Sequence, residues 1–418
     1  MNSFLKNKIA LSLSLLTLII GCSTYKNLDK ENLSELYSLD NSLTAKYRVY
    51  HEDSLKTVVY YQFNFSEFTY IPKSDSSVFY AKYLLKYQLF TDFKATQIID
   101  SASVIFIDSL NYNKNNSSLG YFEITVPKHA KYTLRIELQD LNAKSEIVTI
   151  IEIDKTNAQN RQNFLLIASD NLPEMNPSIS KKTPYRVRHN NPEVKQLIVR
   201  HYGSFLKPAE PPMNDGEAKK TTKLKTDTTF VLNLENGLSD PVLFNKQGLY
   251  HLTIDSSSIG YSVMVFTEGY PWISTPMQMA APMRYITSNQ EYAELIKAED
   301  KTKAVGELWL KLSGTQARAD AMFQIYFNRV QEANMLFNSD REGWLTDRGM
   351  IFIVFGPPDK VFRNNYIETW VYGGLSGRNT ISFNFYQGEN PFTENDYRLD
   401  RTPSYINIWN SAIEFWRR

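Results

Sequence analysis

The chain has 418 residues, of which 42% are hydrophobic, so it is long and apolar enough to form more than one hydrophobic core. Its 46 Lys and Arg nearly balance its 45 Asp and Glu, and the net charge of +1 argues against the positive field of a nucleic-acid-binding protein. Aromatic residues make up 13% of the chain, with 26 Tyr and 24 Phe, which favours β-rich structure.

The first 21 residues have the pattern of a secretory signal peptide. Lys6 and Lys8 precede an apolar run, Ile9 to Ile20, which is shorter than the roughly 20 residues that a membrane-spanning helix needs. The only cysteine, Cys22, directly follows Gly21, and this sequence resembles the bacterial lipoprotein box. The resemblance implies cleavage before Cys22 and lipidation of its thiol, for example with palmitate. The other interpretation is a buried free cysteine.

The residues after Cys22 predict where such an anchor would lie. Residue 23 is Ser, not the aspartate that commonly keeps such lipoproteins in the inner membrane, and "STYKNLDK" lacks the acidic run of a surface-export signal. We therefore expect a lipid anchor in the outer membrane and a body that faces the periplasm. Residues 22–41 are polar and poorly periodic, which predicts a tether that holds the body away from the membrane.

Residues 42–157 predict an all-β sandwich, immunoglobulin-like in type. Runs such as "TVVYYQFNF" and "YTLRIELQD" are rich in β-branched and aromatic residues and are separated by turn sequences. Leu134, Ile136 and Leu138 alternate with Thr133, Arg135 and Glu137, which is the pattern of a half-buried strand.

Residues 158–283 predict a second β-sandwich. Its expected strands include "NFLLIAS", "QLIVRHY" and "YSVMVFTE". Residues 206–226 are rich in Pro, Gly and Lys and predict a mobile loop or a segment that a partner orders. The proline-containing stretch Gly269 to Met283 predicts a linker out of this domain.

Residues 284–418 predict an α+β domain. Ser288 and Glu291 form a capping box for a first helix, Thr315 is the expected N-cap of a later one, and a last helix spans about Ser404 to Trp416. "MIFIVF" at 350–355 is apolar at every position and predicts a central strand, which "YIETWVY" and "ISFNFYQG" extend into a three-stranded meander. Three apolar stripes at helical spacing predict helices that pack on this sheet: Val305, Leu308, Trp309 and Leu312; Phe323, Tyr326, Phe327, Val330 and Phe337; Ile406, Trp409, Ile413 and Trp416.

The stretch Gly343 to Asp347 matches the GWxTD signature, with "RGMIFIVFGPPD" and "ETWVYGG" after it. Over about Asn289 to Ser382, the chain resembles the GWxTD domain-containing lipoproteins of Bacteroidetes, a family with no agreed activity. The helices and the strand with Trp370 and Tyr372 are also similar to the small lipoprotein of the outer-membrane β-barrel assembly machinery.

Two interpretations of the motif remain open. In the first, Trp344 fills the seam between helices and sheet, Asp347 caps backbone N–H groups, and Arg348 pairs with Glu342, Glu368 or Asp359. In the second, Trp344, Asp347 and Trp370 bind or cleave a glycan. The motif and structural residues are Gly343, Trp344, Thr346, Asp347, Arg348, Gly356, Pro357, Pro358, Trp370 and Tyr372; Gly356 and the two prolines are expected to end a strand.

The sequence offers little for catalysis. None of the five histidines, His51, His129, His189, His201 and His251, has a partner at metal-ligand spacing, and no nucleotide-binding or hydrolase motif appears. Glu342 and Asp347 are the one carboxylate pair that a glycosidase mechanism would suggest. We therefore expect a protein without metal or cofactor that is not an enzyme. Its expected role is a scaffold or accessory subunit of a secretion, gliding or outer-membrane biogenesis complex, with protein partners such as a β-barrel.

Overall fold

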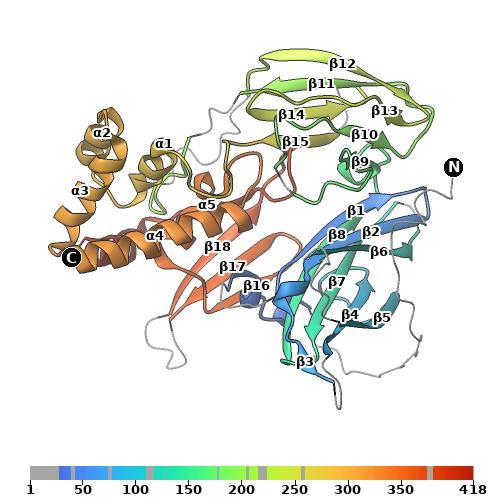
Figure 1. The fold of residues 1–418 in the computed structure, drawn as a ribbon, viewed down its shortest axis with the longest axis horizontal. Coiled ribbons are helices and arrows are strands. Elements are labelled where there is room, and N and C mark those ends of the chain that lie inside the picture. Colours follow the sequence, from blue (N-terminus) through green and yellow to red (C-terminus); the bar gives the residue numbers. More distant parts are fainter. Residues whose placement is uncertain are drawn as a thin grey trace.

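The computed structural model describes residues 28–38, 43–73, 78–109, 117–127, 129–176, 178–203, 207–214, 224–255, 259–373 and 380–417. The expected signal peptide and Cys22 lie outside these residues. Figure 1 shows two β-rich regions on one side of the molecule and the C-terminal helices and sheet on the other. Within the described residues, no helix is both long and apolar enough to cross a membrane.

The first β-rich region consists of two sheets around one core. The three-stranded sheet has the order β1 (Ala45–His51), β2 (Lys56–Asn64) and β6 (Ser117–Thr125). In the other sheet, β4 (Phe79–Phe90) pairs with β3 (Ile71–Pro72), β5 (Asp100–Ser109) and β7 (Lys131–Asp140), and β7 pairs with β8 (Ser145–Asp154). A 3-10 helix, η3 (Phe65–Glu67), follows β2. Strand β5 was not expected from the sequence.

Strand β7 is more buried than its alternating sequence predicts. Leu134, Ile136 and Leu138 face the core as expected, but Thr133 and Arg135 on the other face are also buried. The Arg135 guanidinium donates to Glu31, with 2.8 Å between Nη2 and Oε1. The expectation of a half-buried strand is therefore wrong at this position, because a distant segment of the chain covers the polar face.

The second β-rich region is one seven-stranded sheet that curls around its own core. Its order is β15 (Tyr261–Val265), β14 (Gly248–Thr253), β11 (Gln196–Tyr202), β12 (Thr228–Glu235), β13 (Leu238–Ser239), β10 (Arg186–His189) and β9 (Phe164–Ile167), which follows η4 (Arg161–Asn163). Phe164 on one edge strand stacks against Tyr261 on the other, with 6.0 Å between ring centroids. Side chains of the two edge strands therefore meet in the shared core.

Residues 28–38 do not form a free tether. They contain two 3-10 helices, η1 (Leu28–Lys30) and η2 (Ser34–Tyr37), and Leu28, Leu33 and Tyr37 are buried in the core of the C-terminal region. The tether was predicted because the segment is mostly polar and its three apolar residues are irregularly spaced, so they gave no periodic signal. Its expected role as a spacer is thus wrong for residues 28–38.

The C-terminal helices follow the capping signals closely. Helix α2 (Asn289–Lys297) begins with the Ser288 and Glu291 capping box, and Thr315 caps α4 (Gln316–Leu336). Helix α3 (Lys301–Ser313) buries its expected stripe, and α6 (Ile406–Trp416) follows η7 (Pro403–Tyr405). On α6, Trp409 and Trp416 are buried, whereas Ile406 is exposed.

The expected linker at 269–283 belongs to the C-terminal region instead. Thr275 caps α1 (Pro276–Ala280), and η5 (Ala281–Tyr285) follows directly. Met283 and Tyr285 are buried in the same core as the other helices. Proline at the first position of α1 starts the helix rather than preventing it, because that position needs no N–H donor.

The C-terminal sheet has four strands in meander order, not three. They are β16 (Lys360–Arg363), β17 (Ile367–Tyr372), β18 (Ile381–Gln387) and β19 (Tyr397–Leu399). Residues 350–355, expected as the central strand, are in helix α5 (Asp347–Phe355). Met350 to Val354 are all buried, so the helix has no polar face to show its period, and the strand prediction is wrong for that reason.

Candidate functional site

The GWxTD residues form the junction between α4 and α5. Gly343 to Leu345 make one turn of 3-10 helix, η6, and α5 begins at Asp347. A Cβ atom on Gly343 would collide with the carbonyl oxygen of Ala333, and one on Gly349 would collide with that of Gly343. Gly343 therefore lets the motif turn lie directly against the backbone of α4, and Gly349 lets α5 start directly against that turn.

Thr346, not Asp347, caps α5. Its Oγ1 accepts a hydrogen bond from the Gly349 N–H at 3.0 Å and donates one to the Gly343 carbonyl at 2.8 Å. The threonine thus satisfies one orphan donor of the helix and closes the preceding turn at the same time. Asp347, which the sequence analysis expected to cap backbone N–H groups, accepts one from Leu399, while the cap of α5 itself is Thr346.

Asp347 ties the start of α5 to the end of the sheet. Its Oδ2 accepts from the Leu399 N–H at 2.7 Å, and the two oxygens receive the Arg401 guanidinium at 2.9 and 2.6 Å. The Arg401 and Asp347 side chains are only 4% and 12% exposed. This arrangement is a two-pronged, largely desolvated ion pair, which is a strong form of charged hydrogen bonding.

Trp344 is buried between helices. Its indole Nε1 donates to Glu342 at 2.8 Å. Its backbone N–H donates to the Asn334 side chain on α4 at 3.1 Å, and its backbone carbonyl accepts from the Tyr285 hydroxyl at 2.6 Å. The sequence placed Trp344 at the seam between helices and sheet. Trp344 instead contacts α4 and η5, whereas Trp370 on β17 lies against Phe352 of α5 and Phe337.

Arg348 and Glu368 form a buried ion pair between α5 and β17, as one of the expected pairings predicted. Their closest atoms are 3.3 Å apart, and Glu368 is fully buried. Glu368 also accepts from Trp370 Nε1 at 2.8 Å and from the Tyr37 hydroxyl at 3.0 Å. Burial, with the nearby Glu368 carboxylate next in effect, raises the pKa of Tyr37, so its hydroxyl stays a donor. The acid is therefore surrounded by donors from three segments.

The Arg348 guanidinium is held on its other sides as well. It lies over the Tyr397 ring, 4.2 Å from the centroid, and donates to the Asn395 side chain and to its carbonyl. A guanidinium that stacks on an aromatic face and bonds in its own plane uses both of its modes of interaction. The Arg348 side chain is 4% exposed, so it has no free face to offer a ligand.

Gly356 and the two prolines end a helix instead of a strand. Gly356 has φ 89°, in the region that favours glycine, and terminates α5. The Tyr372 hydroxyl donates to the Gly356 carbonyl at 2.9 Å, which attaches this turn to β17. Pro357 is exposed and Pro358 is buried. The sequence identified the right stop residues but assigned them to the wrong element.

Residues outside the motif complete the site and were not predicted. Arg401 binds Asp347, Tyr37 binds Glu368, and residues 207–214 lie against the motif turn. Arg401 follows the motif by more than fifty positions and Tyr37 precedes Glu368 by more than three hundred. No periodicity or spacing in the sequence connects such distant positions, so only the fold brings them together.

The candidate catalytic groups are occupied by structural bonds. Glu342 accepts from Trp344 Nε1 and from the Thr267 hydroxyl, and Asp347 is paired with Arg401. Among the residues that the structure describes, no group of three or more His, Cys, Asp and Glu side chains could hold a metal ion. Burial lowers the pKa of His51 and of His251 to about 4, so both rings are neutral at pH 7.

One buried carboxyl group lacks a full set of partners. Glu332 on α4 is buried, and its Oε2 has no hydrogen-bond partner in the described part of the chain. Burial raises the pKa of Glu332 to about 7, against the opposite effect of Arg329. A carboxyl group with this pKa has the acidity of a general acid or base, but within the described residues its one charged neighbour is Arg329, which is not a nucleophile.

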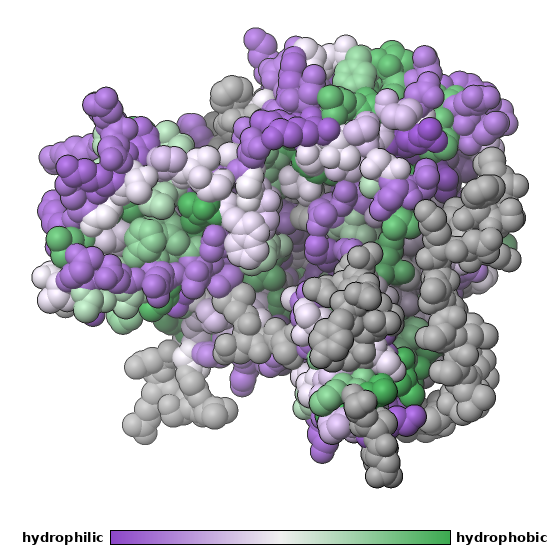
Figure 2. All heavy atoms as spheres, in the orientation of Figure 1, coloured by the Kyte–Doolittle hydropathy of each residue, from purple (hydrophilic) through white to green (hydrophobic). Residues whose placement is uncertain are grey.

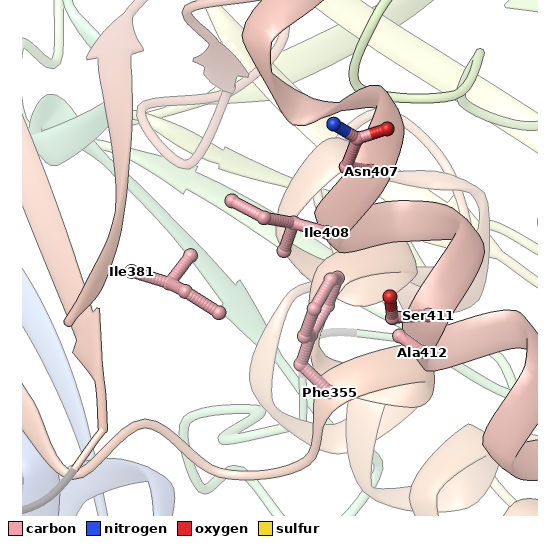
Figure 3. A pocket seen from close by; sticks show the side chains of 6 residues that line it. All are labelled: Phe355, Ile381, Asn407, Ile408, Ser411 and Ala412. Carbon is pink, nitrogen blue, oxygen red and sulfur yellow. The ribbon is translucent and has the colours of Figure 1, made fainter. Parts of the chain in front are cut away.

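An apolar pocket lies between the end of α5, β18 and α6. It is lined by Phe355, Ile381, Asn407, Ile408, Ser411 and Ala412. Figure 3 shows Phe355 and Ile381 facing Ile408, with the Asn407 amide and the Ser411 hydroxyl as the polar groups. The lining contains no ionisable side chain, so the pocket offers no acid–base chemistry.

Comparison with known protein families identifies this region of the chain. Residues 248–418 match the family model of the GWxTD domain. The match begins at β14 and therefore includes the last two strands of the second β-rich region, which lie outside the stretch expected from the sequence. No curated protein matches the chain.

Proposed function

We propose that this chain, which is a GWxTD domain-containing protein, serves as a non-enzymatic scaffold or accessory subunit of an envelope protein complex. It would be an outer-membrane lipoprotein, anchored by lipidated Cys22 and facing the periplasm. The complex would be one for secretion, gliding or outer-membrane biogenesis, with a partner such as a β-barrel. The two β-rich regions would be immunoglobulin-like modules that present edges for docking. The main support is one of those edges, strand β5.

Between Ser101 and Ile107, strand β5 has an edge that pairs with no second strand among the described residues. It pairs with β4 on one side only. From Ser101 to Ile107 it contains no charge and no proline, and Val104, Ile105 and Ile107 are exposed. Proteins normally protect a long apolar edge, because its unpaired N–H and C=O groups accept another strand. In Figure 2, hydrophobic spheres are visible at the surface of this lower β-rich region.

Two other sheet edges in the described part of the chain, at β16 and β1, are protected. Asn32 and Leu33 cover β16: the Leu33 N–H donates to the Val361 carbonyl at 2.8 Å, and the Asn32 side chain accepts from the Val361 N–H at 2.9 Å. The edge strand β1 carries Lys46 and Arg48. An extended strand of a partner, apolar at alternate positions, is therefore the occupant that β5 fits.

The alternative function, glycan binding, lacks a comparable support. Stacking on a sugar needs an exposed aromatic face, but Trp370 is 0% and Trp344 only 9% exposed. Asp347 is held by Arg401 and by the Leu399 N–H. The motif therefore offers neither a ring face nor a free carboxylate to a glycan.

Affinity purification from detergent-solubilised membranes tests the scaffold. Wild type should recover a defined protein partner, and Ile105→Lys with Ile107→Lys should reduce that recovery at least tenfold, because charges on the edge oppose strand pairing. Val231→Lys is the matched control, since Val231 on the interior strand β12 is 54% exposed and Ile107 is 53% exposed. Recovery of a monomer alone, or undiminished recovery by the edge variant, would contradict the proposal.

The membrane anchor has its own test. Metabolic labelling with a palmitate analogue should mark wild type and should not mark Cys22→Ser. A labelled Cys22→Ser protein, or an unlabelled wild type in the soluble fraction, would show that Cys22 is not the anchor.

A further inference from the structure

The segment at 207–214, "KPAEPPMN", lies on the surface of the GWxTD motif. The Ala209 N–H donates to the carbonyl of Leu345, the variable residue of the motif, at 3.1 Å. The Pro212 carbonyl accepts from the Thr402 N–H at 3.1 Å. Ala209 and Met213 are half-buried against the C-terminal core. We call residues 207–214 the strap.

The motif aspartate contributes to this contact through Arg401. Asp347 accepts bidentate hydrogen bonds from the Arg401 guanidinium. Arg401 Nη2 also donates to the Glu210 carbonyl of the strap at 3.0 Å. Asp347 thereby fixes a cation that bonds to the backbone of another segment. The strap is thus bound through three of its main-chain groups, by Leu345, Arg401 and Thr402.

These three bonds do not use the charged and polar side chains of the strap, so recognition rests on the order of its prolines and apolar residues. Lys207, Glu210 and Asn214 are exposed, and Pro212 is the only buried residue among the eight. The three prolines restrict the backbone before binding, which reduces the conformational entropy lost when the segment is held. Main-chain hydrogen bonds are one of the recurring means by which proteins bind extended peptide segments.

The strap is also weakly attached for a segment of a folded chain. It forms no strand pairing and no helix. Three main-chain hydrogen bonds and limited apolar contact hold it, so a second segment that makes the same bonds can compete with it. The strap therefore fills the site, but another segment that makes the same bonds could replace it.

We propose that Leu345, Arg401 and Thr402, with Asp347 as the positioning residue, form a peptide-binding site that the strap occupies in cis. Its ligand in trans is an extended, proline-containing protein segment that replaces the strap. This site is separate from the β5 edge, and its test does not depend on the proposed scaffold function.

A labelled synthetic peptide with the sequence of residues 207–214 tests the site by fluorescence anisotropy. The full chain with residues 207–214 replaced by Gly and Ser should bind the peptide at least tenfold more tightly than wild type, whose site is filled. A peptide N-methylated at the alanine should bind the emptied chain at least tenfold more weakly, because it cannot donate to the Leu345 carbonyl. A scrambled peptide of the same composition is the control.

A second variant covers the case in which the emptied chain does not fold. Pro208→Gly, Pro211→Gly and Pro212→Gly together loosen the strap without removing it, and this variant should bind the peptide several-fold more tightly than wild type. Equal binding of the scrambled or N-methylated peptide would overturn the proposal. Absence of peptide binding to whichever folded variant is obtained would do so as well.

Discussion

The GWxTD region buries charged side chains, whereas the first β-rich region exposes apolar ones. Around the motif, charged side chains are buried and bound to one another, as Arg348 and Glu368 are. On β5, apolar side chains and one backbone edge remain at the surface. The charged and aromatic residues of the motif therefore have a structural role, which we call the frame, whereas strand β5 offers an exposed surface for contact with a partner. The following predictions test that contrast.

Glu368→Ala should have the largest effect on stability. It leaves the Arg348 charge buried without its partner and removes the acceptor of Trp370 and Tyr37, so we expect a loss of about 3–5 kcal/mol in the free energy of unfolding. Urea denaturation measures it. Glu307→Ala is the control, because Glu307 is exposed in an ion pair with Lys303 and should change stability by less than about 0.5 kcal/mol. If both variants lost an equally small free energy of unfolding, the structural interpretation of the motif would be wrong.

Trp344→Ala should cost about 3–4 kcal/mol, because it empties a buried volume and leaves Glu342 without its indole donor. Trp272→Ala, at a tryptophan that is 57% exposed, is the matched control and should cost under about 0.5 kcal/mol. Thermal unfolding and a glycan-binding assay on the same samples separate the two interpretations of the motif. A Trp344→Ala protein of normal stability that loses glycan binding would favour the alternative.

The motif and its surroundings illustrate what sequence patterns can predict. Capping boxes are local, so the starts of α2 and α4 were predicted to the residue from Ser288 and Thr315. Helix α5 was mistaken for a strand because an apolar run that is buried on all sides has no visible period. The signal that could have corrected it, Thr346 followed by Asp347 at the start, is a common N-cap pattern.

Long-range partners could not be predicted in the same way. The acid that Arg348 binds was among three candidates, but the Arg401 partner of Asp347 was not considered. The polar face of β7 was expected to be in solvent. Its burial could not be predicted, because Glu31, which binds Arg135 on that face, lies 104 positions earlier in the chain. Such contacts depend on the relative placement of segments, which neither composition nor periodicity encodes locally.

In the β-rich regions, His51 should make stability depend on pH. The unfolded chain protonates histidine near pH 6.5, whereas burial lowers the pKa of folded His51 to about 4, so the unfolded state binds more protons between these values. The free energy of unfolding should therefore fall as pH drops from about 6.5 to 4, by about 2–3 kcal/mol from this residue. His51→Gln should flatten the profile relative to exposed His129→Gln. Identical profiles for the two variants would contradict this.

Glu332→Gln should stabilise the GWxTD region at neutral to basic pH. Folded Glu332 has its pKa raised to about 7, above the ordinary 4.5, so its contribution to stability is lost as pH rises from about 4.5 through 7. Removing the buried charge should add about 1–2 kcal/mol at pH 8 and little at pH 5. Unfolding at the two pH values measures it, with exposed Glu307→Gln as control. A destabilised variant at pH 8 would indicate an unrecognised partner of the Glu332 carboxylate.

Backbone hydrogen exchange tests most directly whether the motif is the frame and β5 the contact surface. The amides of residues 100–109 and 341–355 are compared in the purified chain and in the membrane-bound protein. We predict that β5 exchanges faster when isolated and becomes protected in the membrane, while the motif is strongly protected in both. Unchanged exchange in β5, with new protection at the motif, would contradict the account.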